Sequence, residues 1–448
     1  MRRPVKHITI ILISLLFSCE TRNSFNPPDE NYFLKYFGNA GNQEGIDFVV
    51  NPDGTFVLLG NSRATPLADQ QVYVAKADSK GNIVWEKTFG GKYDEEAKDI
   101  ELLPDGNLIV LANSANNASN DPAIRERDVM LIKLGQDGSK MDSVKQNQGL
   151  RKIDNLTKGD EDAKSLTILL DGGFIVAGST TAVLANPTKP TDLSDAIHLR
   201  FNPDLTWVDD ATTSWVSRRG YAGEDVAIKV IQYNANEFYV MGYSNIDKQS
   251  QSTVIDFNFW ISGLTGSGTG FFGSPIFAGS VSFDEKLTSV TRIPAQSGSG
   301  YLLTGSSQNT TQGGVHMLTM TEKLSLLPAP IGKNYPDFLG DQRLSLNLVK
   351  PNPMSSASLF SSSNGFYLTS EKLNGSTSDI VLYKMSSSGA DTLLERIFGG
   401  VGDDFAGPVV ELPDGHIVMI GTFTLGGVVD GQKKIVFMKL NKEGRLAP

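Results

Sequence analysis

The sequence has little of what most catalytic and metal sites require. It contains one cysteine, Cys19, among 448 residues, so no internal disulfide can form. Its four histidines have no spacing typical of a zinc site and no motif of a Ser-His-Asp triad. Basic residues, 40 against 50 acidic ones, form no stripe, which argues against a nucleic-acid partner. No segment shows a sustained 3.6-residue period, which excludes α/β folds.

The only long apolar run lies at the N-terminus. Arg2, Arg3 and Lys6 precede an apolar stretch over residues 8–17, and Ser18 and Cys19 follow it. A run of this length is too short to cross a bilayer, which takes about 20 residues, but it suits the core of a signal peptide. The sequence therefore predicts a signal peptide over residues 1–18.

The residues around the cleavage position resemble the lipobox of bacterial lipoproteins, in the run Leu16-Phe17-Ser18-Cys19. Phe17 departs from that pattern, in which a small residue is commoner. The resemblance implies that Cys19 carries a diacylglycerol and an N-acyl chain such as palmitate, enough for stable anchoring. The alternative is an ordinary cleaved signal with an incidental cysteine.

The segment after Cys19 is polar and contains two prolines, so residues 19–31 are expected to form the lipidated cysteine and a flexible tether. Removing residues 1–18 takes away three basic residues and no acid, which moves the net charge from −10 to −13. No other segment has a transmembrane length. We therefore expect an outer-membrane lipoprotein, on a membrane side that the sequence does not indicate.

The remainder is built from an internal repeat. Three copies are plain: VVNPDGTFVLLGNS from Val49, ELLPDGNLIVLANS from Glu101 and VELPDGHIVMIGTF from Val410. Four weaker copies lie between them, so that equivalent positions fall at Gly60, Ala112, Gly178, Gly242, Gly305, Ser370 and Gly421. The spacing between these equivalent positions is typical of large propeller blades.

Each copy reads as four short strands with tight turns. Pro-Asp-Gly joins the first two, because Pro presets φ and Gly accepts a positive φ. Four antiparallel strands make one propeller blade. The sequence thus predicts an all-β fold, a seven-bladed β-propeller over residues 32–448, with six or eight blades as the alternatives.

The two ends of the chain are complementary. The last copy stops near Leu446 without an outer strand, whereas residues 33–38 have the texture of an outer strand and precede the first inner strand. We expect this N-terminal strand to complete the last blade, which removes an exposed sheet edge.

Over most of its length the chain resembles the Pro-Asp-Gly repeat propellers of surface and periplasmic proteins from Bacteroidota-type bacteria. The repeated Phe-Gly-Gly, Asp and Pro-Asp-Gly spacing carries this resemblance. It implies the propeller architecture and a lipoprotein of that type, but no particular activity, because propellers host enzymes, receptors and scaffolds.

One polar position recurs just before each expected inner strand, three residues ahead of a small or aliphatic residue. The seven candidates are Asn42, Asp94, Asp160, Glu224, Asp284, Asp341 and Asp403. Because the position repeats in every copy, a structural role is favoured, in which each side chain accepts backbone N–H bonds. The alternative is an acidic ring at one mouth of the channel, ready for a cation or a basic partner.

The loops between the second and third strands are long and differ in every copy, over residues 63–70, 115–127, 180–194, 245–256 and 424–432. Binding usually resides in such loops, on the same face as the acidic positions. We expect a non-catalytic binding or scaffold module, with a protein partner at the outer membrane or in the periplasm. A carbohydrate-active lyase or hydrolase and a glycan-binding protein remain the alternatives. No cofactor or metal is indicated, although acids of this kind could hold a bridging Ca²⁺.

Overall fold

In the computed structural model, the described residues are 32–116, 126–146, 159–181, 194–205, 215–221, 223–246, 254–279, 283–293, 300–308, 313–321, 338–344, 356–361, 365–386, 392–426 and 431–446. They contain strands and loops, with no helix, and so no helix that could span a membrane. Cys19 and the expected signal peptide and tether lie outside them.

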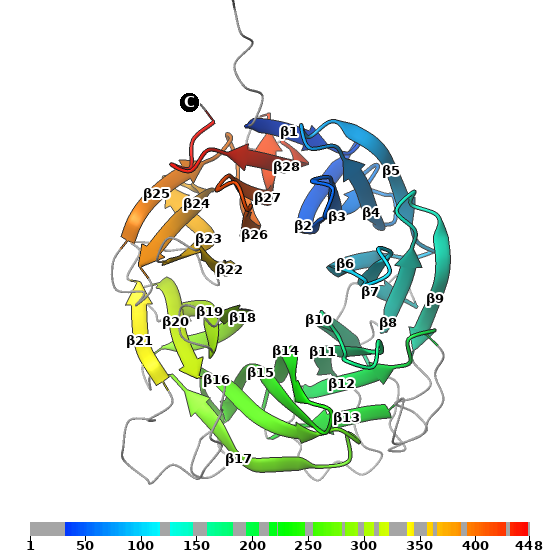
Figure 1. Ribbon diagram of the computed structural model, residues 1–448, viewed down its shortest axis with the longest axis vertical. Coiled ribbons are helices and arrows are strands. Elements are labelled where there is room, and N and C mark those ends of the chain that lie inside the picture. Colours follow the sequence, from blue (N-terminus) through cyan, green and yellow to red (C-terminus); the bar gives the residue numbers. More distant parts are fainter. Residues whose placement is uncertain are drawn as a thin grey trace, which may run out of the picture. The chain divides into compact units, whose positions relative to one another are not determined.

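The described strands form seven four-stranded antiparallel sheets arranged as the blades of a propeller (Figure 1). Blades 1 to 3 consist of β2 (Asn42–Val50), β3 (Phe56–Arg63), β4 (Gln71–Ala77) and β5 (Ile83–Phe89); β6 (Glu95–Leu102), β7 (Leu108–Ala115), β8 (Arg127–Leu134) and β9 (Lys140–Gln146); and β10 (Glu161–Ile168), β11 (Phe174–Thr180), β12 (Asp195–Phe201) and β13 (Trp215–Arg219).

Blades 4 to 6 follow the same order. They consist of β14 (Asp225–Asn234), β15 (Glu237–Ile246), β16 (Val254–Thr265) and β17 (Phe271–Ala278); β18 (Asp284–Ile293), β19 (Gly300–Gln308), β20 (Gly313–Thr321) and β21 (Phe338–Leu344); and β22 (Ser356–Ser361), β23 (Gly365–Asn374), β24 (Thr377–Ser386) and β25 (Thr392–Phe398).

Blade 7 is assembled from both ends of the domain, as expected. It combines β26 (Phe405–Glu411), β27 (Ile417–Leu425) and β28 (Gln432–Leu440) with β1 (Phe33–Phe37), which pairs with β28 as the outermost strand. In this register Phe33 lies opposite Lys439 and Phe37 opposite Ile435. The prediction that the N-terminal segment completes the last blade is confirmed (Figure 1).

The hydrophobic core is divided among the blade interfaces. Seven clusters of buried side chains are present among the described residues, and each combines residues of two consecutive blades. The cluster between blades 7 and 1 contains Phe33 and Phe37 of β1, and both rings contact Phe437. One cluster per interface closes the ring, which establishes seven blades rather than six or eight.

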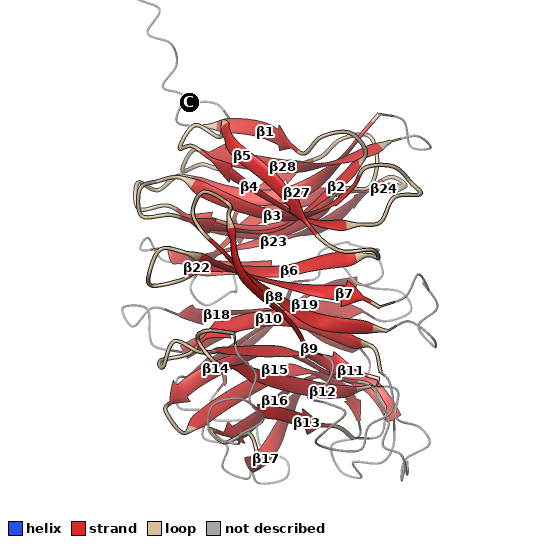
Figure 2. Cartoon of the chain, turned by 90° about the vertical axis from the view of Figure 1, so that its right-hand side faces the viewer, coloured by secondary structure: helices blue, strands red, loops and turns tan. Residues whose placement is uncertain are grey.

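The turns form as their residues predict. In the first Pro-Asp-Gly turn, Gly54 has a φ of 80° and its N–H donates to the carbonyl of Asn51 (2.9 Å), while Oδ1 of Asp53 accepts the N–H of Thr55 (2.9 Å). Hairpins of this kind lie at one end of the blades, and the longer connections lie at the other end. We call these ends the turn face and the long-loop face; Figure 2 shows the blades from the side, with loops at both ends.

Hydrogen bonds join the inner halves of neighbouring blades. In the second strand of a blade, a polar residue follows the small residue of the repeat. Its side chain accepts the backbone N–H of the small residue in the inner strand of the next blade. Asn61 accepts from Ala97 (2.8 Å), Asn113 from Ala163 (2.9 Å) and Thr422 from Gly45 (2.9 Å). The sheet register slips by one residue directly after each of these small residues in β6 and β10, and likewise after Gly45 in β2. This bulge leaves the N–H available to the neighbouring blade.

Candidate functional site

Six of the seven predicted polar positions lie where the sequence places them, at the start of an inner strand. Asn42 and Asp284 begin β2 and β18, Asp94, Asp160 and Glu224 directly precede β6, β10 and β14, and Asp403 lies two residues before β26. We call these six the blade-start residues.

Asp341 is the exception, and its predicted placement is wrong. It lies within β21, the outermost strand of blade 5, opposite Leu318 of β20. The inner strand of blade 6 is β22, which begins at Ser356, fifteen residues further on. Asp341 is therefore not part of the row.

Four blade-start side chains bind the blade that precedes them. Each accepts a backbone N–H from the beginning of that blade's third strand, or from the residue just before it. The N–H of Lys433 donates to Asn42 (3.0 Å), that of Gln70 to Asp94 (2.6 Å), that of Phe257 to Asp284 (3.0 Å) and that of Ser378 to Asp403 (3.1 Å). These bonds fix one blade against the next. They agree with the structural role favoured from the sequence, in which the side chain accepts backbone N–H groups.

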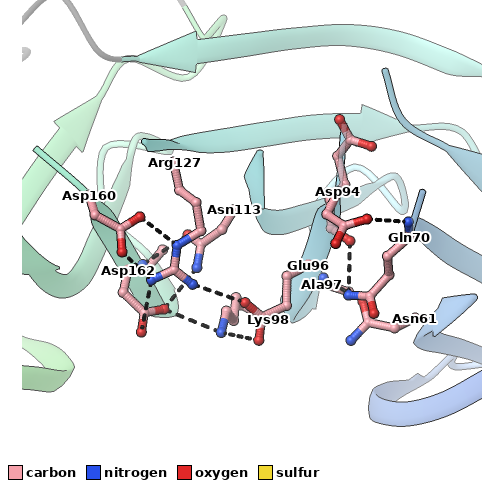
Figure 3. Close-up of polar contacts among 12 residues, drawn as sticks. Asn61, Gln70, Asp94, Glu96, Ala97, Lys98, Asn113, Arg127, Asp160 and Asp162 are labelled. Carbon is pink, nitrogen blue, oxygen red and sulfur yellow. Dashed lines mark hydrogen bonds and ion pairs between the residues drawn. The ribbon is translucent and has the colours of Figure 1, made fainter. Parts of the chain in front are cut away.

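Asp160 makes the same connection through a side chain. Both of its oxygens pair with the guanidinium of Arg127 in β8, at 2.7 Å from Nε and 3.0 Å from Nη2 (Figure 3). Arg127 also reaches Glu96 (3.2 Å) and Asp162 (3.6 Å), and Lys98 joins these two acids at 2.7 and 3.3 Å. Paired, bidentate geometry of this kind is strong and directional.

The charges in this network hold Asp162 in its ionised form. Burial alone would raise the pKa of Asp162, but Lys98, Lys164 and Arg127 keep it well below its ordinary value. The neighbouring acids likewise raise the pKa of Lys98 in spite of its burial. A carboxylate that stays ionised cannot donate a proton, so Asp162 does not suit the role of a general acid.

Glu224 differs from the other blade-start residues. Its carboxylate lies 3.4 Å from the hydroxyl of Tyr243 and 3.8 Å from Nζ of Lys286, whose ammonium group also lies 3.8 Å from the ring centre of Phe257. These contacts connect blades 4 and 5, so Glu224 also links neighbouring blades.

A second row of six residues, five of them acids, was missed from the sequence. The residue after each blade-start residue is buried: Gln43, Glu95, Glu161, Asp225, Glu285 and Asp404. Asp404 accepts the N–H groups of Gly400 (2.5 Å) and Thr424 (2.7 Å), and Asp225 accepts that of Tyr221 (2.6 Å). The signal was present, because five of the six blade-start residues are directly followed by an acid.

Three further acids line the inner strands of blades 1 and 2. Asp47 accepts the N–H of Ile100 (3.3 Å), and Asp99 accepts that of Leu166 (2.7 Å), so both again reach the next blade. Burial and the neighbouring Asp99 raise the pKa of Asp47 well above its ordinary value. Burial and Asp99 also raise the pKa of Glu101 to about 7, against the opposing effect of Lys229. Glu101 is thus a carboxyl group that titrates near neutral pH.

The histidines in the third strands belong to the core. His198 of β12 and His316 of β20 are fully buried, and His316 stacks on Phe259 with ring centres 4.9 Å apart. Burial lowers the pKa of His198 to about 3. Among the described residues no group of His, Cys, Asp and Glu side chains could hold a metal ion.

Of the predicted binding loops, only residues 63–70 are described throughout. There Arg63 pairs with Asp94 (2.8 Å), and Leu67 is 99 % exposed. Most of the other four loops, including residues 117–125 and 182–193, lie outside the described residues.

No protein-family model and no curated protein matches this sequence. Among solved structures, the chain is similar to the β-propeller domain of the Trilobed protease from Pyrococcus furiosus, with 10 % identity, 92 % of this chain and 97 % of that chain covered, and a TM-score of 0.43. It is also similar to Chaetomium thermophilum Sqt1, solved bound to the N-terminus of the ribosomal protein L10, with 11 % identity, 91 % and 98 % covered, and a TM-score of 0.44. A thermostable family-43 glycoside hydrolase shows 12 % identity, 68 % and 99 % covered, and a TM-score of 0.37. These likenesses are too distant to indicate what the chain binds, and the fold assignment rests on the strand pairing itself.

Proposed function

We propose that this protein is a lipid-anchored, non-catalytic binding or scaffold module whose partner contacts the long-loop face. The observation that supports this most is the use of the blade-start side chains. The acids that an enzyme or a cation site would employ at that mouth of the channel instead accept N–H groups or pair with cations of a neighbouring blade. A rigid rim that carries loops of different lengths is a common way to build a protein-binding surface.

The anchor is part of the same proposal. Thirteen residues, 20–32, separate Cys19 from the first residue of β1. Fully extended, such a segment spans roughly 45 Å, at about 3.5 Å per residue. A lipid on Cys19 would therefore hold the propeller close to the membrane surface, within reach of an outer-membrane or periplasmic protein.

Loop replacement tests the proposal. Residues 117–125 and 182–193 would each be replaced by a short Gly-Ser turn, which leaves Arg127 and its pair with Asp160 in place. Cross-linking in cells, followed by mass spectrometry, would identify the partner of the unchanged protein. We expect the shortened variants to fold but to lose that cross-link.

The matched controls lie on the opposite face. Asp53 and Asp105 are exposed acids of Pro-Asp-Gly turns, so Asp53→Lys and Asp105→Lys change charge without touching the loops. Loss of the cross-link with these two variants, and retention with the shortened loops, would contradict the proposal.

A carbohydrate-active enzyme is the second candidate, and Glu101 is the observation in its favour. Its pKa of about 7 would suit a general acid, with Asp99 as a neighbouring carboxylate. Release of reducing ends from polysaccharides by the unchanged protein, abolished in Glu101→Gln, would support this candidate over the binding module.

A further inference from the structure

A pocket of about 430 Å³ lies at the turn face between blades 3, 4 and 5, on the opposite side from the proposed protein-binding loops. Leu170 of the β10–β11 turn forms one side of it, Tyr233 of β14 lies beside it, and Arg292 of β18 and Tyr301 of β19 line the blade 5 side. This volume is in the lower part of the usual range for small-molecule sites, roughly 300–1,000 Å³.

An aromatic side chain is presented at this pocket. Tyr233 is 40 % exposed, although its ring packs against Tyr239 with centres 5.3 Å apart. The contact with Tyr239 positions the ring while part of it remains accessible. A tyrosine placed in this way offers an apolar ring to a ligand together with a hydroxyl group that both donates and accepts hydrogen bonds.

Lys229, one of the two cationic side chains of the pocket, is already engaged within the protein. Nζ of Lys229 donates to the carbonyl of Leu166 (2.7 Å) and lies 3.8 Å from both Asp99 and Glu101, so its charge is already balanced. The amide of Gln232 is oriented as well, because its Oε1 accepts the N–H of Leu170 (2.7 Å). What Gln232 can offer a ligand is the donor end of its amide.

We propose that this pocket binds a neutral saccharide unit, stacked on Tyr233 and hydrogen-bonded by Gln232 and Arg292. A sugar ring has an apolar face of C–H groups that suits an aromatic ring, and its hydroxyl groups both donate and accept. The lining offers amide, guanidinium and phenol groups together with the apolar side chain of Leu170, and this combination matches such a ligand. The site is independent of the protein-binding loops and would add a second ligand to the propeller.

A glycan array tests the proposal directly. The full-length protein, in a detergent without a sugar headgroup, would be applied to an array of neutral and uronate-containing oligosaccharides, and the best neutral binder would be titrated by calorimetry. Tyr233→Ala removes the aromatic stacking partner and should weaken binding about tenfold, which corresponds to about 1.4 kcal/mol. Gln232→Leu should weaken it several-fold.

Tyr36→Ala is the matched control, because Tyr36 is a similarly exposed tyrosine on the outermost strand of blade 7. This variant should bind like the unchanged protein, and thermal unfolding would confirm that all variants are folded. Absence of binding to every glycan, or equal binding by folded Tyr233→Ala, would overturn the proposal. A preference for uronate glycans that Arg292→Gln abolishes would overturn it too, since it would show an anion site.

Discussion

At the scale of single residues, the blade-start position distinguishes a structural hydrogen bond from a cation site. Asn42 fills this position in blade 1 with a neutral side chain and accepts the N–H of Lys433 with its amide oxygen. An amide oxygen therefore suffices for the contact between blades. A cation site, by contrast, would need the carboxylate charge.

Asp403 provides the corresponding experiment. Its Oδ1 accepts both the N–H and the hydroxyl of Ser378, at 3.1 Å each. Asp403→Asn retains an acceptor and should change the free energy of unfolding by less than about 0.5 kcal/mol. Asp403→Ala removes it and should cost roughly 1–2 kcal/mol, measured by urea unfolding. Equal losses in the two variants would show that charge, not the acceptor, is what matters.

Glu101 predicts a pH dependence of stability. Its pKa rises from the ordinary 4.5 to about 7 in the folded chain, so between these values the folded state binds more protons than the unfolded state. The free energy of unfolding should therefore fall as the pH rises through this interval. Glu101→Gln removes this titration. The difference in free energy of unfolding between the variant and the unchanged protein should therefore grow in favour of the variant from pH 4.5 to 7 and stay constant above pH 7.

The expected gain is about 1–2 kcal/mol, below the roughly 3 kcal/mol of the full shift, because 37 % of the side chain is exposed and solvent screens it. Urea unfolding at several pH values measures it. Asp53→Asn is a control of opposite sign, since hydrogen bonds from Thr55 lower the pKa of Asp53. That variant should lose stability relative to the unchanged protein as the pH rises. A Glu101→Gln difference that is flat with pH would contradict the assignment.

At the scale of strands and turns, local sequence patterns predicted where the turns and the blade-start residues lie, but not which groups form hydrogen bonds with the blade-start residues. The Pro-Asp-Gly turns depend on a few adjacent residues, and the positive φ of Gly54 follows from them. The donors to the blade-start residues come from another blade: Gln70 is 24 residues from Asp94, and Lys433 is 391 residues from Asn42. A pattern of neighbouring residues does not contain that information.

The error at Asp341 has the same origin. An acid three residues before Leu344 repeats the spacing of the other copies, but spacing alone does not say which strand the residues join. Pairing with β20 decides this and makes the segment the outer strand of blade 5. The second row of acids, in contrast, could have been predicted, because its residues adjoin the first row in the sequence.

The closing strand β1 allows a sharp test at this scale. Phe37 is fully buried in the cluster between blades 7 and 1, whereas the neighbouring Tyr36 is 46 % exposed. Phe37→Ala should cost about 3–5 kcal/mol, and Tyr36→Ala less than about 1 kcal/mol. Deletion of residues 20–38 should lower the melting temperature sharply, whereas deletion of residues 20–31 alone should change it little. Equal effects of the two deletions would show that β1 does not hold the ring closed.

At the scale of the whole molecule, the fold was predictable because seven copies of the repeat each indicate the same four-stranded blade. Weak copies, such as the one leading to Ser370, are supported by the strong ones on either side. Function has no such redundancy. The residues of the pocket beside Tyr233 come from three blades, so no single copy of the repeat describes that site.

The position of β1 also makes the proposed anchor testable. Because the strand that closes blade 7 is preceded by residues 20–32, a lipid on Cys19 would connect the membrane directly to the ring closure. Cys19→Ser removes the only thiol of the chain, and we expect the protein to move from the membrane fraction to the soluble fraction after a salt wash. Three acyl chains hold a protein far more firmly than one, so the shift should be nearly complete.

A matched variant separates the lipid from the thiol. Ser24→Cys in the Cys19→Ser background returns a cysteine to the same segment, but outside the run Leu16-Phe17-Ser18-Cys19, so it should not restore membrane attachment. If Cys19→Ser alone still sediments with washed membranes, another contact holds the protein there. A partner protein would then hold the propeller at the membrane. In that case the variants with shortened loops, which lose the partner, should leave the membrane fraction.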